Sequence, residues 1–499
     1  MEPIAPHLDP DQCYAAHSAR DPRADGQFFT AVTSTGIFCR TICPARTPKR
    51  ENCQFVPTAA AAIALGYRPC LRCRPETAPG TGAWLGTVAV VQRGMRLIEQ
   101  GALDQGGSVQ DLAHKLGLTS RHLRRLFEQH LGAPPKAIAL ARRLELARRL
   151  IRETSLTMTD IALASGFSSS RRFNDAFRRS YGNPPSSLRR SSRNTSSSPD
   201  PSGALTLTLR ASPPFDATGT LRWFASRAAG AHEHLREDGS YARLYRIGDA
   251  IAACEITPLP DQAGLSIAVR STDLSILPRL TALINWQFGL GFIATHRNDH
   301  LSQDPILRPM IDQRPGLRLP ASPDPVEAAA RAILGQQVSV KAARTLCIRL
   351  VEQFGMPVEQ PLWLDAETPA RLFPDAATLA EAPIEQIGVP GRRAETFRRL
   401  MSALATGDIK LDHAVPIAEL RAQLLDLKGI GPWTADYICL RALGESDAFP
   451  SGDLGLVRGS IALGGPETAK ALDAYAAEHW SPYRAHAALY LWAASNTPL

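Results

Sequence analysis

The stretch Leu424–Asp453 constrains the fold more than any other part of the chain. It reads LLDLKGIGPWTADYICLRALGESDAFPSGD, so an apolar segment meets two glycines, Gly429 and Gly431, followed by Pro432. Glycines let backbone N–H groups crowd together in a tight turn, and proline suits the first turn of a helix. The stretch therefore predicts two helices joined by a hairpin whose amide groups would bind a phosphate. A plain linker with a helix-capping Asp453 is the alternative, because a bare Gly-x-Gly turn is not specific.

Four cysteines form two close pairs: Cys39 with Cys43, and Cys70 with Cys73. Four thiolates arranged in this way make a tetrahedral zinc site. Scattered buried cysteines are the alternative, but the close pairing favours the metal. Cys13 and Cys53 lie outside the pattern and are expected to be unliganded. The total of nine cysteines is odd, which indicates a reducing cytoplasm rather than a disulfide framework.

Residues 84–190 contain an internal repeat. SVQDLAHKLGLTSRHLRRLFEQHLGAPP aligns with TMTDIALASGFSSSRRFNDAFRRSYGNPP, and Gly117 and Gly166 stand at equivalent turns. Apolar residues recur at helical spacing in both copies, so each copy predicts a helix–turn–helix unit. Ser120 and Ser168 are the expected N-caps of the second helices.

Positive charge is concentrated in and around this repeat. Residues 84–193 hold 19 Lys and Arg against 8 Asp and Glu, a net charge of +11, whereas the whole chain carries +8. Such concentration is typical of a nucleic-acid-binding module. The alternative is a small helical bundle with solvated arginines. Whether the arginines would read guanines or only phosphates is left open by the sequence.

The rest of the chain separates into three parts. Residues 191–203, SSRNTSSSPDPSG, cannot bury a core and predict a flexible linker. Alternating runs such as ALTLTLR and GLSIAVR predict strands among helices over residues 204–315, and residues 316–499 are helical. We therefore expect a multidomain α+β protein. Its parts would be a small zinc domain (1–80), an all-α double helix–turn–helix domain (84–190), a mixed α+β domain, and an all-α helix–hairpin–helix domain.

The first 80 residues resemble the N-terminal domain of the Ada-type methylation-response proteins. RDPRADGQFFTAVTSTGIFCRTICPAR, RENCQFV and GYRPCLRCRP carry the resemblance. It implies that Cys39 takes a methyl group from a methylated DNA phosphate, while one zinc ion keeps the sulfur anionic. The resemblance implies as ligands Cys39, Cys43, Cys70 and Cys73. It implies DNA contacts at Thr35, Arg46 and Arg68.

A charge argument suggests how such a sensor would switch. A zinc centre with four thiolates carries a charge of about −2, and methylating Cys39 makes its sulfur neutral. Repulsion from the DNA phosphates then falls, so we expect DNA affinity to rise.

The repeat resembles the AraC-type DNA-binding domain. The resemblance implies two recognition helices for adjacent major grooves. Their expected DNA-facing residues are Arg121, Arg124 and Arg125 in the first unit, and Arg171 and Arg172 in the second.

Nearly 300 residues at the C-terminal end resemble the AlkA-type 3-methyladenine DNA glycosylases. PFDATGTLRWFASRA, DPVEAAARAILGQQVSV, GIGPWTADYICLRAL, FPSGDLGLVR and YRAHAALYLWAAS correspond to that family. The resemblance implies that Asp453 stabilises the sugar cation left when an extruded base departs, and that Gly429 and Gly431 bind DNA. It implies a base pocket lined by Trp433, Tyr437, Trp492 and Trp223, whose rings would attract a cationic base.

Three details refine this prediction. Gln337 stands where the best-known member of the family has an apolar wedge that fills the gap left by the base. Trp433 stands where strand-cutting relatives have a lysine, so we expect a monofunctional enzyme that leaves an abasic site. The resemblance also implies a monovalent cation on the carbonyls of Leu425, Leu427 and Gly429.

Together these features predict an adaptive-response protein that senses methylated phosphate, activates transcription and excises alkylated bases. One rival is a regulator with a non-catalytic, glycosylase-like DNA clamp. Another is a glycosylase that its N-terminal half merely targets to DNA, with purely structural zinc. No Pro-Cys-His-Arg motif occurs, so repair of O6-methylguanine is not predicted.

The expected partners are double-stranded DNA, both alkylated and promoter, and RNA polymerase. The N-terminus MEPIAPHLDPD does not read as a signal peptide, and no apolar run approaches the ~20 residues of a membrane span. We therefore expect a cytoplasmic protein at the bacterial nucleoid, with no membrane partner.

Overall fold

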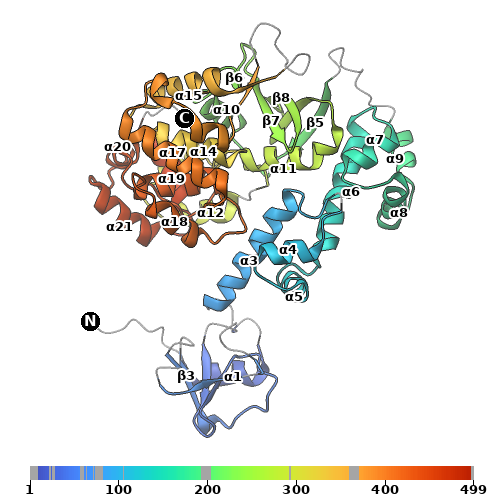
Figure 1. Cartoon of the computed structure of the whole chain (residues 1–499). Coiled ribbons are helices and arrows are strands. Elements are labelled where there is room, and N and C mark those ends of the chain that lie inside the picture. Colours follow the sequence, from blue (N-terminus) through green and yellow to red (C-terminus); the bar gives the residue numbers. More distant parts are fainter. Residues whose placement is uncertain are drawn as a thin grey trace. The chain divides into compact units, whose positions relative to one another are not determined.

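Figure 1 shows the computed structural model of the chain. The structure describes residues 9–21, 24, 28–56, 61–62, 65–70, 72–73, 82–104, 106–192, 204–291, 294–358 and 370–495. Most of the linker predicted at 191–203 therefore lies outside the described residues. The chain divides into two compact units. They are Met1–Arg96 with Val109–Pro135, and Leu97–Ser108 with Lys136–Leu499.

The N-terminal part of the first unit is a small sheet with one helix. Its elements are α1 (Pro10–Ala19), β1 (Phe29–Val32), β2 (Ile37–Cys39), the 3-10 helix η2 (Arg50–Asn52), β3 (Cys53–Val56) and β4 (Arg68–Pro69). The strand order is β3-β1-β2-β4, with β2 and β4 parallel and the other pairs antiparallel. Phe29, Phe38 and Val56 are buried between these elements, but the apolar core is small.

Helices follow in both units, as the repeat predicts. They are α3 (Gly82–Glu99), α4 (Val109–Lys115) and α5 (Ser120–Leu131), then α6 (Pro135–Glu153), α7 (Met158–Ala164), α8 (Ser170–Tyr181) and α9 (Pro185–Ser192). Gly117 and Gly166 have φ of +70° and +82° at the two turns, a conformation that glycine adopts without strain.

The predicted N-caps of α5 and α8 are wrong by one residue. Thr119 caps α5, because its hydroxyl accepts the His122 N–H at 3.3 Å, whereas Ser120 is already the first helical residue. Ser169 caps α8 by accepting the Arg172 N–H at 3.3 Å. A cap must stand just outside the first turn to reach the N–H groups two or three residues on, and that position is sensitive to small shifts of the helix start.

The second unit continues with the mixed α+β part. Its elements are β5 (Leu205–Arg210), α10 (Ala217–Ala225), β6 (Glu233–Leu235), β7 (Tyr241–Ile247), β8 (Ala250–Pro258), β9 (Gly264–Ser271), η5 (Leu274–Ile276) and α11 (Leu277–Gln287). The sheet is antiparallel throughout, in the order β5-β9-β8-β7-β6. Tyr241 of β7, Ile267 of β9 and Leu280 of α11 belong to one buried apolar cluster, so α11 covers this sheet (Figure 1).

The C-terminal part is helical, as predicted. Its elements are α12 (Ala294–Leu301), α13 (Arg308–Gln313), α14 (Pro325–Leu334), α15 (Val340–Phe354), β10 (Met356–Pro357), β11 (Arg371–Leu372), α16 (Ala376–Glu381), η6 (Ile384–Ile387), α17 (Gly391–Thr406), α18 (Ile417–Asp426), α19 (Pro432–Leu443), α20 (Leu454–Ala462), α21 (Ala469–His479) and α22 (Arg484–Ala494). The multidomain α+β architecture expected from the sequence is confirmed. None of the helices described here has the length and apolar run that a membrane span requires.

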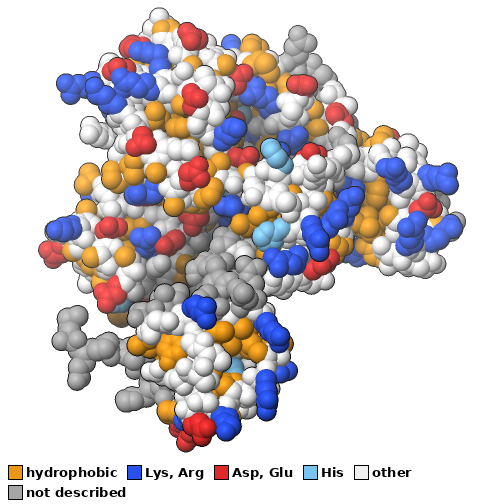
Figure 2. Space-filling model, turned by 60° about the horizontal axis from the view of Figure 1, so that its bottom comes forward, with side chains coloured by type: hydrophobic (Ala, Val, Ile, Leu, Met, Phe, Trp, Pro, Cys, Tyr) orange, Lys and Arg blue, Asp and Glu red, His pale blue; other side chains and the backbone are white. Residues whose placement is uncertain are grey.

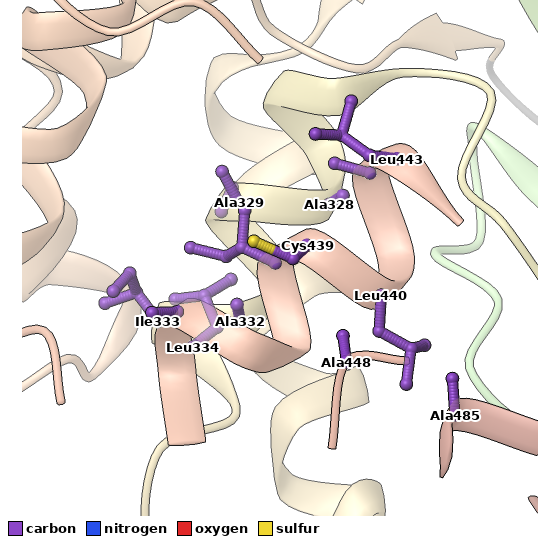
Figure 3. Packing of buried hydrophobic residues seen from close by; sticks show 14 of the residues in the cluster. Ala328, Ala329, Ala332, Ile333, Leu334, Cys439, Leu440, Leu443, Ala448 and Ala485 are labelled. Atoms are coloured by element: carbon purple, nitrogen blue, oxygen red, sulfur yellow. The ribbon is translucent and has the colours of Figure 1, made fainter. Parts of the chain in front are cut away.

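The packing of α14 against α19 forms the centre of this helical part. Figure 3 shows Ala328 and Ala332 of α14 near Cys439 of α19. Side chains this small allow the two helix backbones to approach closely, and tight packing transmits position accurately. Helix α19 therefore gives a rigid base for the residues at its N-terminal end.

Candidate active site and metal centre

The four paired cysteines come together at one end of the small sheet. Cys39 ends β2, and the N–H of Cys70, just after β4, donates to the Phe38 carbonyl at 3.0 Å. The ligand sulfurs of the four cysteines all lie within 4.8 Å of one another, and Cys43 Sγ is 3.9 Å from Cys70 Sγ. Zn–S bonds of about 2.3 Å in a tetrahedron put the sulfurs about 3.8 Å apart, so the cluster fits zinc.

Crowding of the thiols also indicates a need for a cation. Hydrogen bonds to Cys43 and Cys73 raise the pKa of the Cys39 thiol well above its ordinary value, whereas the same sharing lowers the pKa of Cys43 to about 2. One sulfur therefore ionises at the expense of its neighbour, and all four ionise together only when a dication balances them.

The sulfurs differ in their backbone contacts. The Arg40 N–H donates to Cys73 Sγ at 3.3 Å, and the Ala45 N–H donates to Cys43. Among the residues that the structure describes, no such backbone donor reaches Cys39. All four side chains are at least 91% buried, so exposure does not single out one of them.

The residues expected to contact DNA in the first 200 positions are exposed. Thr35 lies in the turn between β1 and β2, and Arg46 and Arg68 are exposed on the same small domain. The expected recognition residues are all exposed too: Arg121, Arg124 and Arg125 on α5, and Arg171 and Arg172 on α8. Figure 2 shows Lys and Arg side chains on the lobe at the right, where α8 and α9 lie.

The predicted hairpin joins α18 to α19. Gly429 has φ of +98°, and a Cβ there would lie 2.0 Å from Thr396 Oγ1. Gly431 is the N-cap of α19, has φ of −98°, and a Cβ there would meet open space. Pro432 occupies the first turn of α19. Gly429 thus serves the turn itself, whereas the absent side chain of Gly431 leaves the outer surface free.

Asp453 stands immediately before α20 and serves two purposes. Its carboxylate accepts the N–H groups of Gly455 (2.8 Å) and Leu456 (3.2 Å), which makes it the cap of the helix. The same carboxylate accepts the indole N–H of Trp433 (3.1 Å) and of Trp492 (3.1 Å). Asp453 is half-buried and lines a cavity of about 1410 Å³, called here the Asp453 cavity. Asp453 therefore caps α20 and also lines the cavity.

Aromatic rings form one wall of the Asp453 cavity. Trp433 and Tyr437 stack one helical turn apart on α19, with centroids 5.3 Å apart and planes inclined by 12°. Trp492 of α22 meets Tyr437 edge-on, with centroids 6.4 Å apart. Both indole N–H groups donate to Asp453, and both indole rings contact Tyr437. The three rings and the carboxylate are therefore positioned by one another.

Trp223 also lines the cavity, but its ring is already engaged. The guanidinium carbons of Arg227 and Arg441 lie 4.1 and 4.0 Å from its ring centroid, and only 5% of the residue is exposed. Cations near an aromatic face use the same attraction that a cationic base would use. Trp223 is therefore part of the floor of the cavity, beside two arginines.

Sequence reasoning missed the charged groups beneath this floor. Four side chains form an ion-pair network in which Arg331 is partly exposed and the other three are buried: Glu233, Arg243, Glu327 and Arg331. It joins β6 and β7 to α14, and removing one member of such a network is strongly destabilising. Arg441 follows Tyr437 by four residues on α19, and this spacing could have predicted that it lies on the same helical face as the aromatic wall.

The rim of the cavity includes Gln337 in an unusual conformation. Gln337 is exposed and has φ of +57°, which costs energy for a residue with a side chain. The neighbouring Gln336 donates to the Gly429 carbonyl (3.3 Å) and to Thr434 Oγ1 (2.9 Å), which ties the rim to the hairpin. Gln337 itself is exposed and lines the cavity.

Comparisons with known proteins identify the parts of the chain. Family models match the chain for the metal-binding domain of Ada (residues 12–76), a helix-turn-helix domain (residues 112–191) and the AlkA N-terminal domain (residues 206–324). These matches, with the relatives below, confirm the resemblances stated from the sequence. The Ada match and the four-cysteine cluster together support one zinc ion.

Three relatives cover different shares of the chain. A probable bifunctional transcriptional activator/DNA repair enzyme AlkA of Mycobacterium tuberculosis is 39% identical over 494 residues, 99% of this chain and 98% of that protein. DNA-3-methyladenine glycosylase 2 of Escherichia coli is 30% identical over 57% of this chain and 96% of that protein. The bifunctional transcriptional activator/DNA repair enzyme Ada of Escherichia coli is 39% identical over 32% of this chain and 43% of that protein.

Proposed function

Because the chain belongs to the family of bifunctional transcriptional activator/DNA repair enzymes, we propose that it excises alkylated bases from DNA and activates transcription in response to the same damage. The observation that carries the excision proposal is the carboxylate of Asp453. It lies beside an open cavity and is held by two tryptophans of that cavity. A purely capping aspartate would need neither.

The excision follows from the positions of these groups. A base swung out of the duplex enters the Asp453 cavity and contacts the rings of Trp433, Tyr437 and Trp492. As its bond to the sugar breaks, positive charge develops on the sugar, and the Asp453 carboxylate stabilises that charge and orients the attacking water. Four N–H donors fix the carboxylate in advance, so little reorganisation is required.

Residues at the rim of the cavity would bind the DNA backbone and fill the gap that the extruded base leaves in the duplex. The hairpin amides and the exposed Lys341 suit phosphates, and Gln337 would enter the space that the base leaves. Trp433 occupies the place of a Schiff-base lysine, so the product would be an abasic site in an uncut strand. The carbonyls of Leu427 and Gly429 already accept hydrogen bonds, so a monovalent cation would use their second lone pairs.

The two hairpin glycines should respond differently to alanine. Gly429→Ala should lower the free energy of unfolding by roughly 2 kcal/mol or more, because a side chain there meets Thr396 at a φ that disfavours alanine. Gly431→Ala should change stability by less than about 0.5 kcal/mol, yet weaken binding to duplex DNA, because its methyl group faces outward. Urea unfolding and titration with an abasic duplex measure both effects. Normal DNA affinity in the folded Gly431→Ala protein would show that the hairpin does not contact DNA.

The N-terminal domain would accept a methyl group at Cys39. When bound, zinc keeps the cysteine sulfurs anionic and therefore nucleophilic. N–H donors reach Cys43 and Cys73 and lower their nucleophilicity, whereas no described backbone donor reaches Cys39 or Cys70. Of these two, Cys39 is the one that the Ada resemblance implies as the acceptor. Its sulfur attacks the methyl carbon of a methylphosphotriester, and the phosphate leaves as a diester anion. The exposed Thr35, Arg46 and Arg68 would hold the surrounding phosphates.

Methylation should switch DNA affinity. Exposure to a duplex with one methylphosphotriester should add about 14 Da to the Cys39 peptide and none to the peptide of Cys53, which lies outside the cluster. Affinity for duplex DNA at low salt should rise roughly tenfold, because one charge about 10 Å from a phosphate is worth about 1–2 kcal/mol. Mass spectrometry and fluorescence anisotropy measure the two results. Equal affinity before and after methylation would rule out the charge switch.

The two helix–turn–helix units would carry out the regulatory function. The arginines of α5 and α8 would read promoter DNA, and the bound protein would recruit RNA polymerase. The intact carboxylate and cavity speak against a clamp without catalysis.

A further inference from the structure

Arg441 lies at the inner end of the Asp453 cavity, on the same helical face as the aromatic wall. It follows Trp433 by eight residues and Tyr437 by four on α19, so the three side chains form one stripe. Its guanidinium carbon lies 4.0 Å from the Trp223 ring centroid, and only 7% of the residue is exposed. Arg441 is therefore a buried cation that lines the space in which a base would sit.

Among the residues that the structure describes, no carboxylate forms an ion pair with this cation. The two buried glutamates beneath the floor already pair with Arg243 and Arg331, two against two. Among the described residues, Arg441 makes no side-chain hydrogen bond or ion pair, and its Nη1 is buried without a partner. Burial, with Arg227 and Arg331 nearby, lowers the pKa of Arg441 to about 10, so the group remains charged at neutral pH.

Burying an unpaired guanidinium such as that of Arg441 costs free energy, because the group loses its hydration. Buried polar groups in folded proteins are almost always hydrogen-bonded, and exceptions cluster at functional sites. Cation–π contact with Trp223 offsets part of the cost, but it leaves the in-plane N–H donors unused. Nη1 has no accessible surface, so an acceptor on a bound base would reach the guanidinium through its other N–H groups.

The charge also distinguishes two classes of leaving group. A cationic alkylpurine takes the electron pair of the broken C1′–N bond and leaves as a neutral base. An uncharged purine takes the same pair and becomes an anion until a proton reaches it. In both cases water supplies hydroxide to C1′. Its proton is released when the base leaves neutral, and ends on the departed base when the base leaves as an anion. A fixed cation at the inner end of the cavity stabilises the second case and gives the first no advantage.

We propose that Arg441 determines specificity, by enabling the cavity to expel uncharged purine lesions. This role rests on the proposed glycosylase activity. It differs from that of Asp453, which stabilises the sugar for either class. Arg441 touches the base, so its loss affects one substrate class far more than the other.

The test compares two lesions in one duplex context. Hypoxanthine represents the uncharged class and 7-methylguanine the cationic class, with single-turnover rates normalised to sites titrated by abasic DNA. Arg441→Met should slow hypoxanthine release by about a hundredfold and 7-methylguanine release by less than about threefold. Arg441→Gln, which is smaller and polar, should show the same split, and Arg441→Lys should recover part of the hypoxanthine rate. Arg349→Met removes a guanidinium outside the cavity and should affect neither rate.

Each outcome decides between explanations. An equal loss on both lesions in Arg441→Met and Arg441→Gln would mean that Arg441 only supports the fold of the pocket, and would overturn the inference. Wild-type protein that releases 7-methylguanine but not hypoxanthine would overturn it too, with the glycosylase proposal intact. Wild-type protein that releases neither base would contradict the glycosylase proposal itself.

Discussion

Asp453→Asn should slow the release of 3-methyladenine from methylated DNA by at least roughly a hundredfold, the usual effect of removing a key charge at a transition state. The change removes the negative charge and replaces one oxygen by an N–H donor, which would face the indole N–H of Trp433 or Trp492. Single-turnover release of the base, measured by chromatography, gives the rate directly.

The substitution separates catalysis from helix capping. Asparagine caps helices about as well as aspartate, so α20 should remain folded in Asp453→Asn. Binding to abasic duplex should also change little, since the rim is untouched. Asp473→Asn removes an exposed carboxylate on α21 and is the matched control, with wild-type rates expected. A rate for Asp453→Asn within a fewfold of wild type would assign the aspartate to capping alone.

Removal of zinc should unfold the N-terminal domain. Its strands are two to four residues long, and its apolar cluster contains few large side chains, chiefly Phe29 and Phe38. Binding of a structural zinc is worth about 10–16 kcal/mol at neutral pH, which far exceeds what so small a core supplies. A chelator should therefore abolish hydrogen-exchange protection in β1–β4, and adding zinc back should restore it.

The rest of the chain provides the internal control for zinc removal. The glycosylase part has its own large core, which includes Ile333, Phe397 and Trp480. Base release should therefore persist in chelated protein, while methyl transfer to Cys39 stops. If hydrogen-exchange protection of β1–β4 survived complete removal of the metal, zinc binding by the cysteines would not be what stabilises this domain.

Local patterns in the sequence predicted much of this structure. The spacing of the cysteine pairs and the Gly429–Gly431 hairpin depend on neighbouring residues, so geometry follows from spacing. The N-caps of α5 and α8 were wrong by one residue, because a cap depends on where the first turn closes. Short-range information fixes an element, but not its last residue.

Long-range convergence could not be predicted from spacing. Trp433 and Trp492 approach Asp453 from 20 residues before and 39 residues after it, and only packing brings their N–H groups to one carboxylate. The contact of Arg441 with the Trp223 ring likewise joins α19 to α10, which are far apart in the sequence. The sequence therefore predicted which residues form the site, whereas the structure shows how Asp453 is held and what covers Trp223.

We expect this one chain to carry two separate chemistries for alkylated DNA. One duplex that contains both a methylphosphotriester and 3-methyladenine tests this claim most directly, with methylated Cys39 and released base measured in the same reaction. Wild-type protein should give both products, Asp453→Asn should give only methylated Cys39, and chelated protein should give only the free base. Wild-type protein that yields only one of the two products, or an Asp453→Asn protein that still releases the base at the wild-type rate, would contradict this claim.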